Sequence, residues 1–200
     1  MKPQAFQLDR FLERRPEPQE ARMLGAGTEL NPLMKLAATL RDRGHGDVVT
    51  YSPKVFVPLT VLCRDVCHYC TFAKQPRELI HTYLSESQVL EIARAGKENG
   101  CHEVLFTLGD KPELRYRAAR EALETLGFDT TAQYLAHIAG RVFDQTGLLP
   151  HINAGILEAD EMAALREVSA SQGIMLESAA PRLSERGGPH YGSPDKRPEV

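Results

Sequence analysis

The chain has 200 residues, of which 42% are hydrophobic and 26% charged, and its net charge is −3. This composition is typical of a folded soluble domain, and the slightly acidic balance argues against a nucleic-acid-binding surface. No apolar run reaches the roughly 18 residues of a membrane-spanning helix, and the N-terminus lacks the pattern of a secretory signal. We therefore expect no membrane association and a cytoplasmic protein, in which the four cysteines are reduced.

The first elements form a lead-in. Residues 1–30 combine charges, prolines and glycines, which predicts a flexible N-terminal segment. A helix is expected from Pro32 to about Gly44, because proline suits a first helical turn and apolar side chains recur along one face. We expect residues 31–200 to form one domain.

Beyond that helix, short apolar runs alternate with amphipathic stretches. Ser85 and Gln88 have the spacing of a capping box at a helix start. The predicted order is strand 55–59, helix 85–99, strand 104–108, helices 115–126 and 130–145, strand 148–153, helix 158–171 and strand 174–177. Such alternation indicates βαβ units and a parallel sheet, so the fold class is α/β. Four strands are fewer than a closed barrel needs.

Polar residues follow the predicted strands where each strand ends. A loop with three cysteines follows the first strand, Gly109 and Asp110 follow the second, Asn153 ends the third and Glu177 ends the fourth. Ligands of parallel α/β proteins bind at the carboxyl ends of the strands. We therefore expect these groups to meet at one edge of the sheet.

The cysteine loop (residues 63–70) reads Cys-Arg-Asp-Val-Cys-His-Tyr-Cys, with thiols at Cys63, Cys67 and Cys70. Three thiolates on one loop can bind three corners of an iron–sulfur cube and leave one iron open to a small molecule. A structural zinc site is an alternative, although no second cysteine pair follows. The fourth zinc ligand would have to be His68, Cys101 or His81. A redox disulfide between Cys67 and Cys70 would leave Cys63 without a role.

The spacing Cys63-x3-Cys67-x2-Cys70 after a first strand, with an aromatic residue before the last cysteine, resembles the radical S-adenosylmethionine superfamily. The resemblance implies a full or partial (β/α)6 barrel. It also implies a [4Fe-4S] cluster on the three cysteines, with S-adenosylmethionine bound at the open iron. Reductive cleavage would give a 5′-deoxyadenosyl radical that abstracts a hydrogen atom from the substrate.

Four longer blocks resemble one family in that superfamily, 7,8-didemethyl-8-hydroxy-5-deazariboflavin synthase, in particular its ring-closing subunit. The blocks are TYSPKVF at 50–56, CHYCTFA at 67–73, FTLGDKPE at 106–113 and GGPHYGSPDK at 187–196. The sister subunit, which couples tyrosine to a ribityl-uracil, usually differs around its last two cysteines. The second block therefore favours the ring-closing subunit.

The resemblance implies a reaction of deazaflavin coenzyme (F-420) biosynthesis. The substrate would be 5-amino-5-(4-hydroxybenzyl)-6-(D-ribitylimino)-5,6-dihydrouracil, which would cyclise with loss of ammonia. The enzyme would thus be a carbon-nitrogen lyase or synthase. The implied partners are the sister tyrosine-coupling subunit and a low-potential electron donor. The alternatives are the sister transferase, another radical enzyme acting on an aromatic substrate, and a non-catalytic zinc- or cluster-binding fragment. Because the family continues for two more βα units, we expect a truncated, partial barrel of about four units with weak or no activity alone.

The resemblance also implies roles for single residues. Tyr69 is expected to lie against the adenine of the cofactor. Gly109 and Asp110 are expected to bind the methionyl ammonium, because they stand where the superfamily often has Gly-Gly-Glu. Leu108 departs from that pattern. Asn153 and Glu177 are candidates for the ribose or methionyl group, and His190 and Tyr191 for the substrate. The structural alternatives are loop packing for Tyr69, helix capping for Asp110, polar caps for Asn153 and Glu177, and an exposed loop for His190 and Tyr191.

Overall fold

A computed structural model describes residues 8–200 of the chain. The chain divides into two units, Met1–Tyr51 and Ser52–Val200. The division falls after Tyr51, whereas the sequence placed the start of the domain at residue 31. None of the described helices is both long enough and apolar enough to cross a membrane.

The first unit is helical. It contains a short 3-10 helix and two α-helices, Leu8–Leu12, α1 (Pro18–Gly27) and α2 (Leu30–His45). The predicted lead-in therefore holds helical elements from Leu8 on, while its residues 1–7 lie outside the described residues. The helix predicted from Pro32 begins at Leu30 instead, because the N–H groups of a first helical turn have no intrahelical acceptor and a proline there costs no hydrogen bond.

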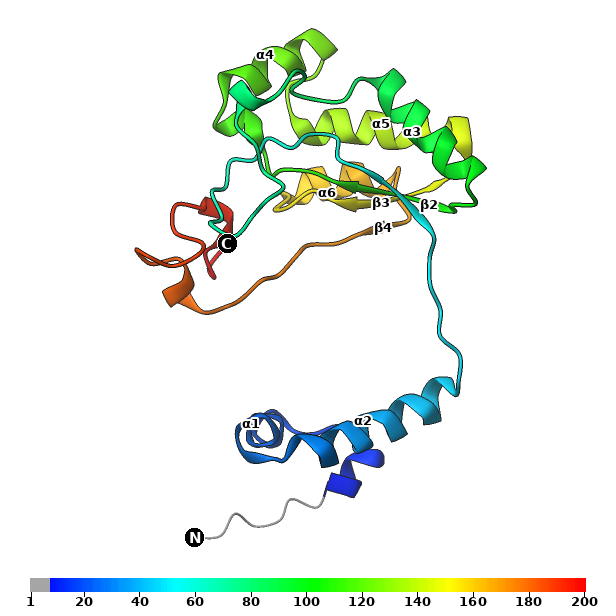
Figure 1. Ribbon diagram of the computed structural model, residues 1–200, viewed down its shortest axis with the longest axis vertical. Coiled ribbons are helices and arrows are strands. Elements are labelled where there is room, and N and C mark those ends of the chain that lie inside the picture. Colours follow the sequence, from blue (N-terminus) through cyan, green and yellow to red (C-terminus); the bar gives the residue numbers. More distant parts are fainter. Residues whose placement is uncertain (1–7) are drawn as a thin grey trace. The chain divides into compact units, whose positions relative to one another are not determined.

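The second unit is built on a four-stranded parallel sheet in the order β1-β2-β3-β4 (Figure 1). The strands are β1 (Lys54–Val57), β2 (Glu103–Thr107), β3 (Leu149–Asn153) and β4 (Ser171–Gln172). Its helices are α3 (Glu86–Glu98), α4 (Arg117–Leu126), α5 (Thr131–Thr146) and α6 (Ala159–Arg166). This alternation confirms the predicted α/β class with parallel strands.

Local sequence signals fix where these helices begin. At the start of α3, Ser85 Oγ accepts from the N–H of Gln88 at 3.3 Å, and Gln88 Oε1 accepts from the N–H of Ser85 at 2.9 Å. This is the predicted capping box, which satisfies two N–H groups that the helix itself cannot pair. At the start of α5, Thr130 Oγ1 accepts from the N–H of Gln133 at 3.1 Å.

The core lies between one face of the sheet and the helices α3 and α5, which cover that face in Figure 1. Val57, Phe106 and Ile152 are register neighbours on successive strands and have no exposed surface. On the other face, Phe56 and Leu105 remain partly exposed. Because side chains alternate along a strand, only one face of the sheet is fully covered by the described chain.

The fourth strand differs from the prediction. The pairing stops at Gln172, and the predicted strand 174–177 lies outside the sheet, with Ile174 53% and Leu176 82% exposed. The preceding helix also ends early, at Arg166, and the hydroxyl of Ser169 donates to the Leu165 carbonyl at 2.7 Å beyond that end. An apolar run alone does not make a strand, because the backbone also needs a partner to pair with.

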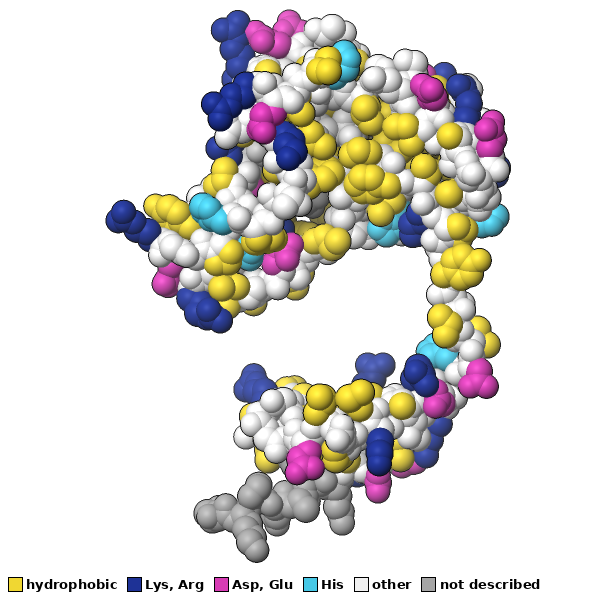
Figure 2. Space-filling view, viewed as in Figure 1, with side chains coloured by type: hydrophobic (Ala, Val, Ile, Leu, Met, Phe, Trp, Pro, Cys, Tyr) yellow, Lys and Arg dark blue, Asp and Glu magenta, His cyan; other side chains and the backbone are white. Residues whose placement is uncertain are grey.

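The surface charge of the second unit is mixed. On the face shown in Figure 2, Lys and Arg side chains are dispersed among Asp and Glu rather than gathered into one basic patch. A surface that binds nucleic acid through its phosphates usually has such a patch.

Candidate metal centre

A cavity of about 410 Å³ lies where the strands of the second unit end. The cysteine loop, the Gly109 loop, the end of β3 and the chain after β4 all contribute to its lining. All the residues predicted to bind the metal or the cofactor line it, namely Cys63, Cys67, Cys70, Tyr69, Gly109, Asp110, Asn153 and Glu177. The four segments meet because the strands are parallel and adjacent, so that their carboxyl ends lie at one edge of the sheet, as predicted.

Each of the three clustered sulfurs has a polar neighbour. Cys63 Sγ accepts from the N–H of Asp110 at 3.3 Å, and Cys70 Sγ accepts from the N–H of Ala73 at 3.4 Å. Cys67 Sγ lies 3.4 Å from Ser193 Oγ. All four cysteines of the chain are within the described residues, and each is a free thiol, so the structure holds no Cys67–Cys70 disulfide. Burial raises the pKa of the Cys63 thiol to about 11.

Gly109 allows the second loop to pack against the first. A Cβ at this position would lie 1.7 Å from the carbonyl oxygen of Leu62, which is far inside contact distance. The N–H of Gly109 donates to the Thr60 carbonyl at 3.1 Å, and the N–H of Arg64 donates to the Asp110 carbonyl at 2.9 Å. The glycine is therefore required for close approach of the two loops rather than for an unusual backbone angle.

Asp110 is buried at the wall of the cavity, with 6% of its surface exposed. Its Oδ2 accepts from the N–H of Ile156 at 2.9 Å, while its Oδ1 has no hydrogen-bond partner. Carboxylate oxygens of Asp65 and Asp195 lie within 4.8 Å of one another and of Asp110. Burial and, to a smaller extent, the charges of Asp195 and Asp65 raise the pKa of Asp110 to about 7, whereas Arg64 opposes the rise.

The last predicted loop of the chain, the C-terminal loop (residues 187–196), packs on the cysteine loop. The Arg64 guanidinium pairs with both carboxylate oxygens of Asp195. The Asp195 N–H donates to Asp65 Oδ1 at 3.2 Å, and Ser193 Oγ accepts from the N–H of Val66 at 2.9 Å. Sequence reasoning missed these residues, although the block that contains Ser193 and Asp195 was singled out.

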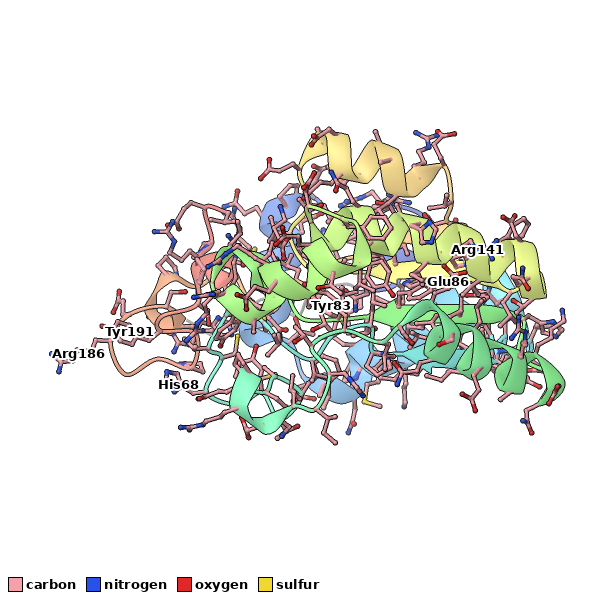
Figure 3. All side chains as sticks on the ribbon, turned by 90° about the horizontal axis from the view of Figure 1, so that it is seen from above. His68, Tyr83, Glu86, Arg141, Arg186 and Tyr191 are labelled. Carbon is pink, nitrogen blue, oxygen red and sulfur yellow. The ribbon has the colours of Figure 1, made fainter. Side chains whose placement is uncertain are left out.

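Two other residues of that block, His190 and Tyr191, lie next to the cysteine loop. His190 is buried, and its ring centroid lies 5.5 Å from that of Tyr69. Tyr191 is half-exposed, and its carbonyl oxygen lies 3.3 Å from the Nε2 of His68, so the two residues are close together in Figure 3. Neither His190 nor Tyr191 is among the described residues that line the cavity.

Asn153 and Glu177 reach the cavity in different ways. Asn153 is the last residue of β3, as predicted. Glu177 does not end a strand, since it follows β4 in an exposed segment, where it forms an ion pair with Lys196 at 3.6 Å. Both side chains line the cavity with the cysteines.

The alternative zinc ligands do not join the three cysteines. Cys101 packs against the hydrophobic core just before β2, at the opposite end of that strand from the cavity. His68 and His81 are exposed. None of these three is among the cavity-lining residues within 8–200.

Known proteins resemble this chain in sequence. No family model matches it. Over 193 residues it is 48% identical to a protein named FO synthase from Mycobacterium tuberculosis, covering 89% of this chain and 22% of that protein. It is 48% identical to an FO synthase from Streptomyces avermitilis, covering 87% and 21%. It is 49% identical over 152 residues to 7,8-didemethyl-8-hydroxy-5-deazariboflavin synthase from Methanopyrus kandleri, covering 76% and 46%. The chain thus spans about a fifth of the first two relatives and about half of the third.

Solved structures share the fold. Methylornithine synthase superposes with a TM-score of 0.59 at 20% identity, over 86% of this chain and 47% of that chain. The hydrogenase maturase HydG from Carboxydothermus hydrogenoformans superposes with a TM-score of 0.68 at 19% identity, over 96% and 42%. The four-stranded sheet and its helices therefore match part of larger α/β proteins, which confirms the predicted partial fold.

Proposed function

We propose that this chain carries the cluster and cofactor site of a deazaflavin-forming enzyme. It is homologous to the FO synthases and to 7,8-didemethyl-8-hydroxy-5-deazariboflavin synthase. Its motifs resemble those of radical S-adenosylmethionine enzymes. The observation that carries the proposal is the single cavity that holds three free thiols and a buried carboxylate oxygen without a partner.

The three thiols fit a [4Fe-4S] cluster with one open iron. Cys63, Cys67 and Cys70 would bind it, because thiolates are the usual ligands of such clusters and hydrogen bonds to their sulfurs tune it. Each of these sulfurs already has such a neighbour. Burial keeps Cys63 protonated in the metal-free protein, so iron would have to displace that proton when it binds.

The carboxylate wall fits S-adenosylmethionine. Asp110 Oδ1 is buried without a donor, and an unpaired buried carboxylate is costly, so a ligand ammonium would satisfy it. The methionyl ammonium would therefore lie at Asp110 and the Gly109 loop. Tyr69 would contact the adenine, and Asn153 or Glu177 the ribose or carboxylate. The cavity volume of about 410 Å³ is in the range of small-molecule sites.

When bound, the cluster and S-adenosylmethionine would supply the chemistry for radical hydrogen abstraction from the substrate. The residues of the chain would orient the ligand and exclude water. Phe72, Leu108 and Ile156 provide apolar surface in the cavity wall next to the polar groups. Exclusion of water protects a reactive intermediate from side reactions.

The finer parts of the proposal concern substrate and partners. The substrate would be 5-amino-5-(4-hydroxybenzyl)-6-(D-ribitylimino)-5,6-dihydrouracil, which closes its ring with loss of ammonia. The sister tyrosine-coupling subunit would supply it, and a low-potential donor would reduce the cluster. A substrate contact of His190 or Tyr191 stays a prediction, since neither lines the cavity. We also propose that the four-stranded unit is part of a larger (β/α)6 barrel, and that turnover by this chain alone is weak or absent.

Anaerobic reconstitution with iron and sulfide tests the proposal. The reduced protein should give the EPR signal of a [4Fe-4S] cluster, and S-adenosylmethionine should change that signal. Cys67→Ala should lose the signal, while the matched control Cys101→Ala, away from the cavity, should keep it. A colourless parent protein that retains zinc would contradict the proposal and favour a structural metal site.

A further inference from the structure

Two loops far apart in the sequence pack on each other at the candidate metal centre. Arg64 of the cysteine loop pairs with Asp195 of the C-terminal loop, and the Asp195 side chain is 2% exposed. The N–H of His68 donates to the Pro189 carbonyl at 2.9 Å. Buried charge-assisted bonds of this kind hold two segments in a fixed relation.

Ser193 occupies the centre of this contact. It is 3% exposed, its Oγ accepts from the N–H of Val66 at 2.9 Å, and the same Oγ lies 3.4 Å from Cys67 Sγ. A hydroxyl has one proton to donate and two lone pairs. Since the Val66 N–H uses a lone pair, the Ser193 proton remains free for the sulfur.

The direction of the hydrogen bond between Ser193 and Cys67 follows from the charge of the Cys67 sulfur. A free thiol and a hydroxyl can each donate to the other. A metal-bound Cys67 is a thiolate and has no proton, so Ser193 must then be the donor. A reduced cluster carries one more negative charge than an oxidised one. A donor at a ligand sulfur therefore stabilises the reduced state and raises the reduction potential.

We propose that Ser193 is a positioning residue that donates its hydroxyl proton to the Cys67 sulfur and raises the reduction potential of the cluster. This inference rests on the proposed function, because it requires a cluster on the cysteine loop. It adds a residue from the C-terminal loop to the surroundings of the cluster and gives that loop a role in electron uptake.

The test is an EPR-monitored redox titration of the reconstituted full chain. Ser193→Ala should shift the potential to a more negative value than that of the parent. Ser193→Thr keeps a hydroxyl and should restore the parental potential. Ser184→Ala is the matched control, because the Ser184 hydroxyl donates to the Lys196 carbonyl at 3.0 Å in the same segment, away from the sulfurs. Its potential should equal that of the parent.

The outcomes separate the two proposals. A parent without a [4Fe-4S] cluster overturns the proposed function and this inference with it. A parental cluster whose potential is unchanged in Ser193→Ala, or shifted equally by Ser184→Ala, overturns the inference alone. If Ser193→Ala assembles no cluster, Ser193→Val replaces it, because valine has nearly the shape of the threonine variant but no hydroxyl to donate. An unchanged potential in that variant overturns the inference equally.

Discussion

Replacing Asp110 with asparagine in the metal-free protein tests the electrostatics of the cavity wall. The carboxylate is buried, with one oxygen paired to the Ile156 N–H and the other unpaired. Its nearest acidic neighbours, Asp65 and Asp195, disfavour a further negative charge. An amide has nearly the shape of a protonated carboxyl group and keeps an acceptor for Ile156. Asp110→Asn therefore represents the neutral state of the site.

The rise in the pKa of Asp110 from 3.8 to about 7 sets the magnitude and the sign of the change in the free energy of unfolding. Below the pKa of the unfolded chain, Asp110 carries its proton in both the folded and the unfolded state, so no charge is buried on folding. As the pH rises, Asp110 loses its proton first in the unfolded chain. The free energy of unfolding therefore falls until the pH passes the pKa of Asp110 in the folded chain. At 1.36 kcal/mol per pH unit, the rise of about three pH units corresponds to about 4 kcal/mol.

Asp110→Asn should accordingly leave the free energy of unfolding nearly unchanged at about pH 4 and raise it by up to about 4 kcal/mol at about pH 8. Urea denaturation of the metal-free protein at both pH values measures this difference. Asp144→Asn, which removes the same charge from an exposed side chain of α5, controls for net charge. An Asp110→Asn variant that unfolds at lower urea than the parent at about pH 8 would refute the reasoning.

Other substitutions test packing. Gly109→Ala should destabilise the protein by about 3 kcal/mol or more, because the added Cβ meets the Leu62 carbonyl at 1.7 Å. Gly44→Ala, where nothing lies within 4 Å, should not lower the thermal midpoint, and equal midpoints for both variants would contradict the clash. Thr131→Val should cost about 1–3 kcal/mol in urea denaturation, because the Thr131 hydroxyl donates to buried Glu113 at 2.6 Å. A neutral effect would show that Glu113 finds another donor.

Local and strand-end signals explain why much of the site could be predicted. The Ser85 capping box depends on residues three apart, so the sequence contains all of it. The meeting of Asp110, Asn153 and the cysteine loop follows from adjacent parallel strands, which bring their carboxyl ends together whatever the loops contain. Such features need only the order of the elements.

Features that depend on distant partners could not be predicted. The apolar run at Ile174 and Leu176 predicts a strand, but the sheet pairs only Ser171–Gln172, since pairing depends on a neighbouring strand and not on hydrophobicity. The pair of Arg64 and Asp195 joins side chains with a sequence separation of 131, and no local pattern matches one charge to another over that span. The role of Ser193 was missed for the same reason.

The sequence separation of 131 between Arg64 and Asp195 also orders events during synthesis. A ribosome that adds about 5–20 residues per second adds Arg64 roughly 7 to 26 s before it reaches Asp195. During that interval the three thiols exist without the loop that later packs on them. Nascent chains would thus offer Cys67 to incoming iron before Ser193 has been made, and the C-terminal loop would then pack against a cysteine loop that can already hold its cluster.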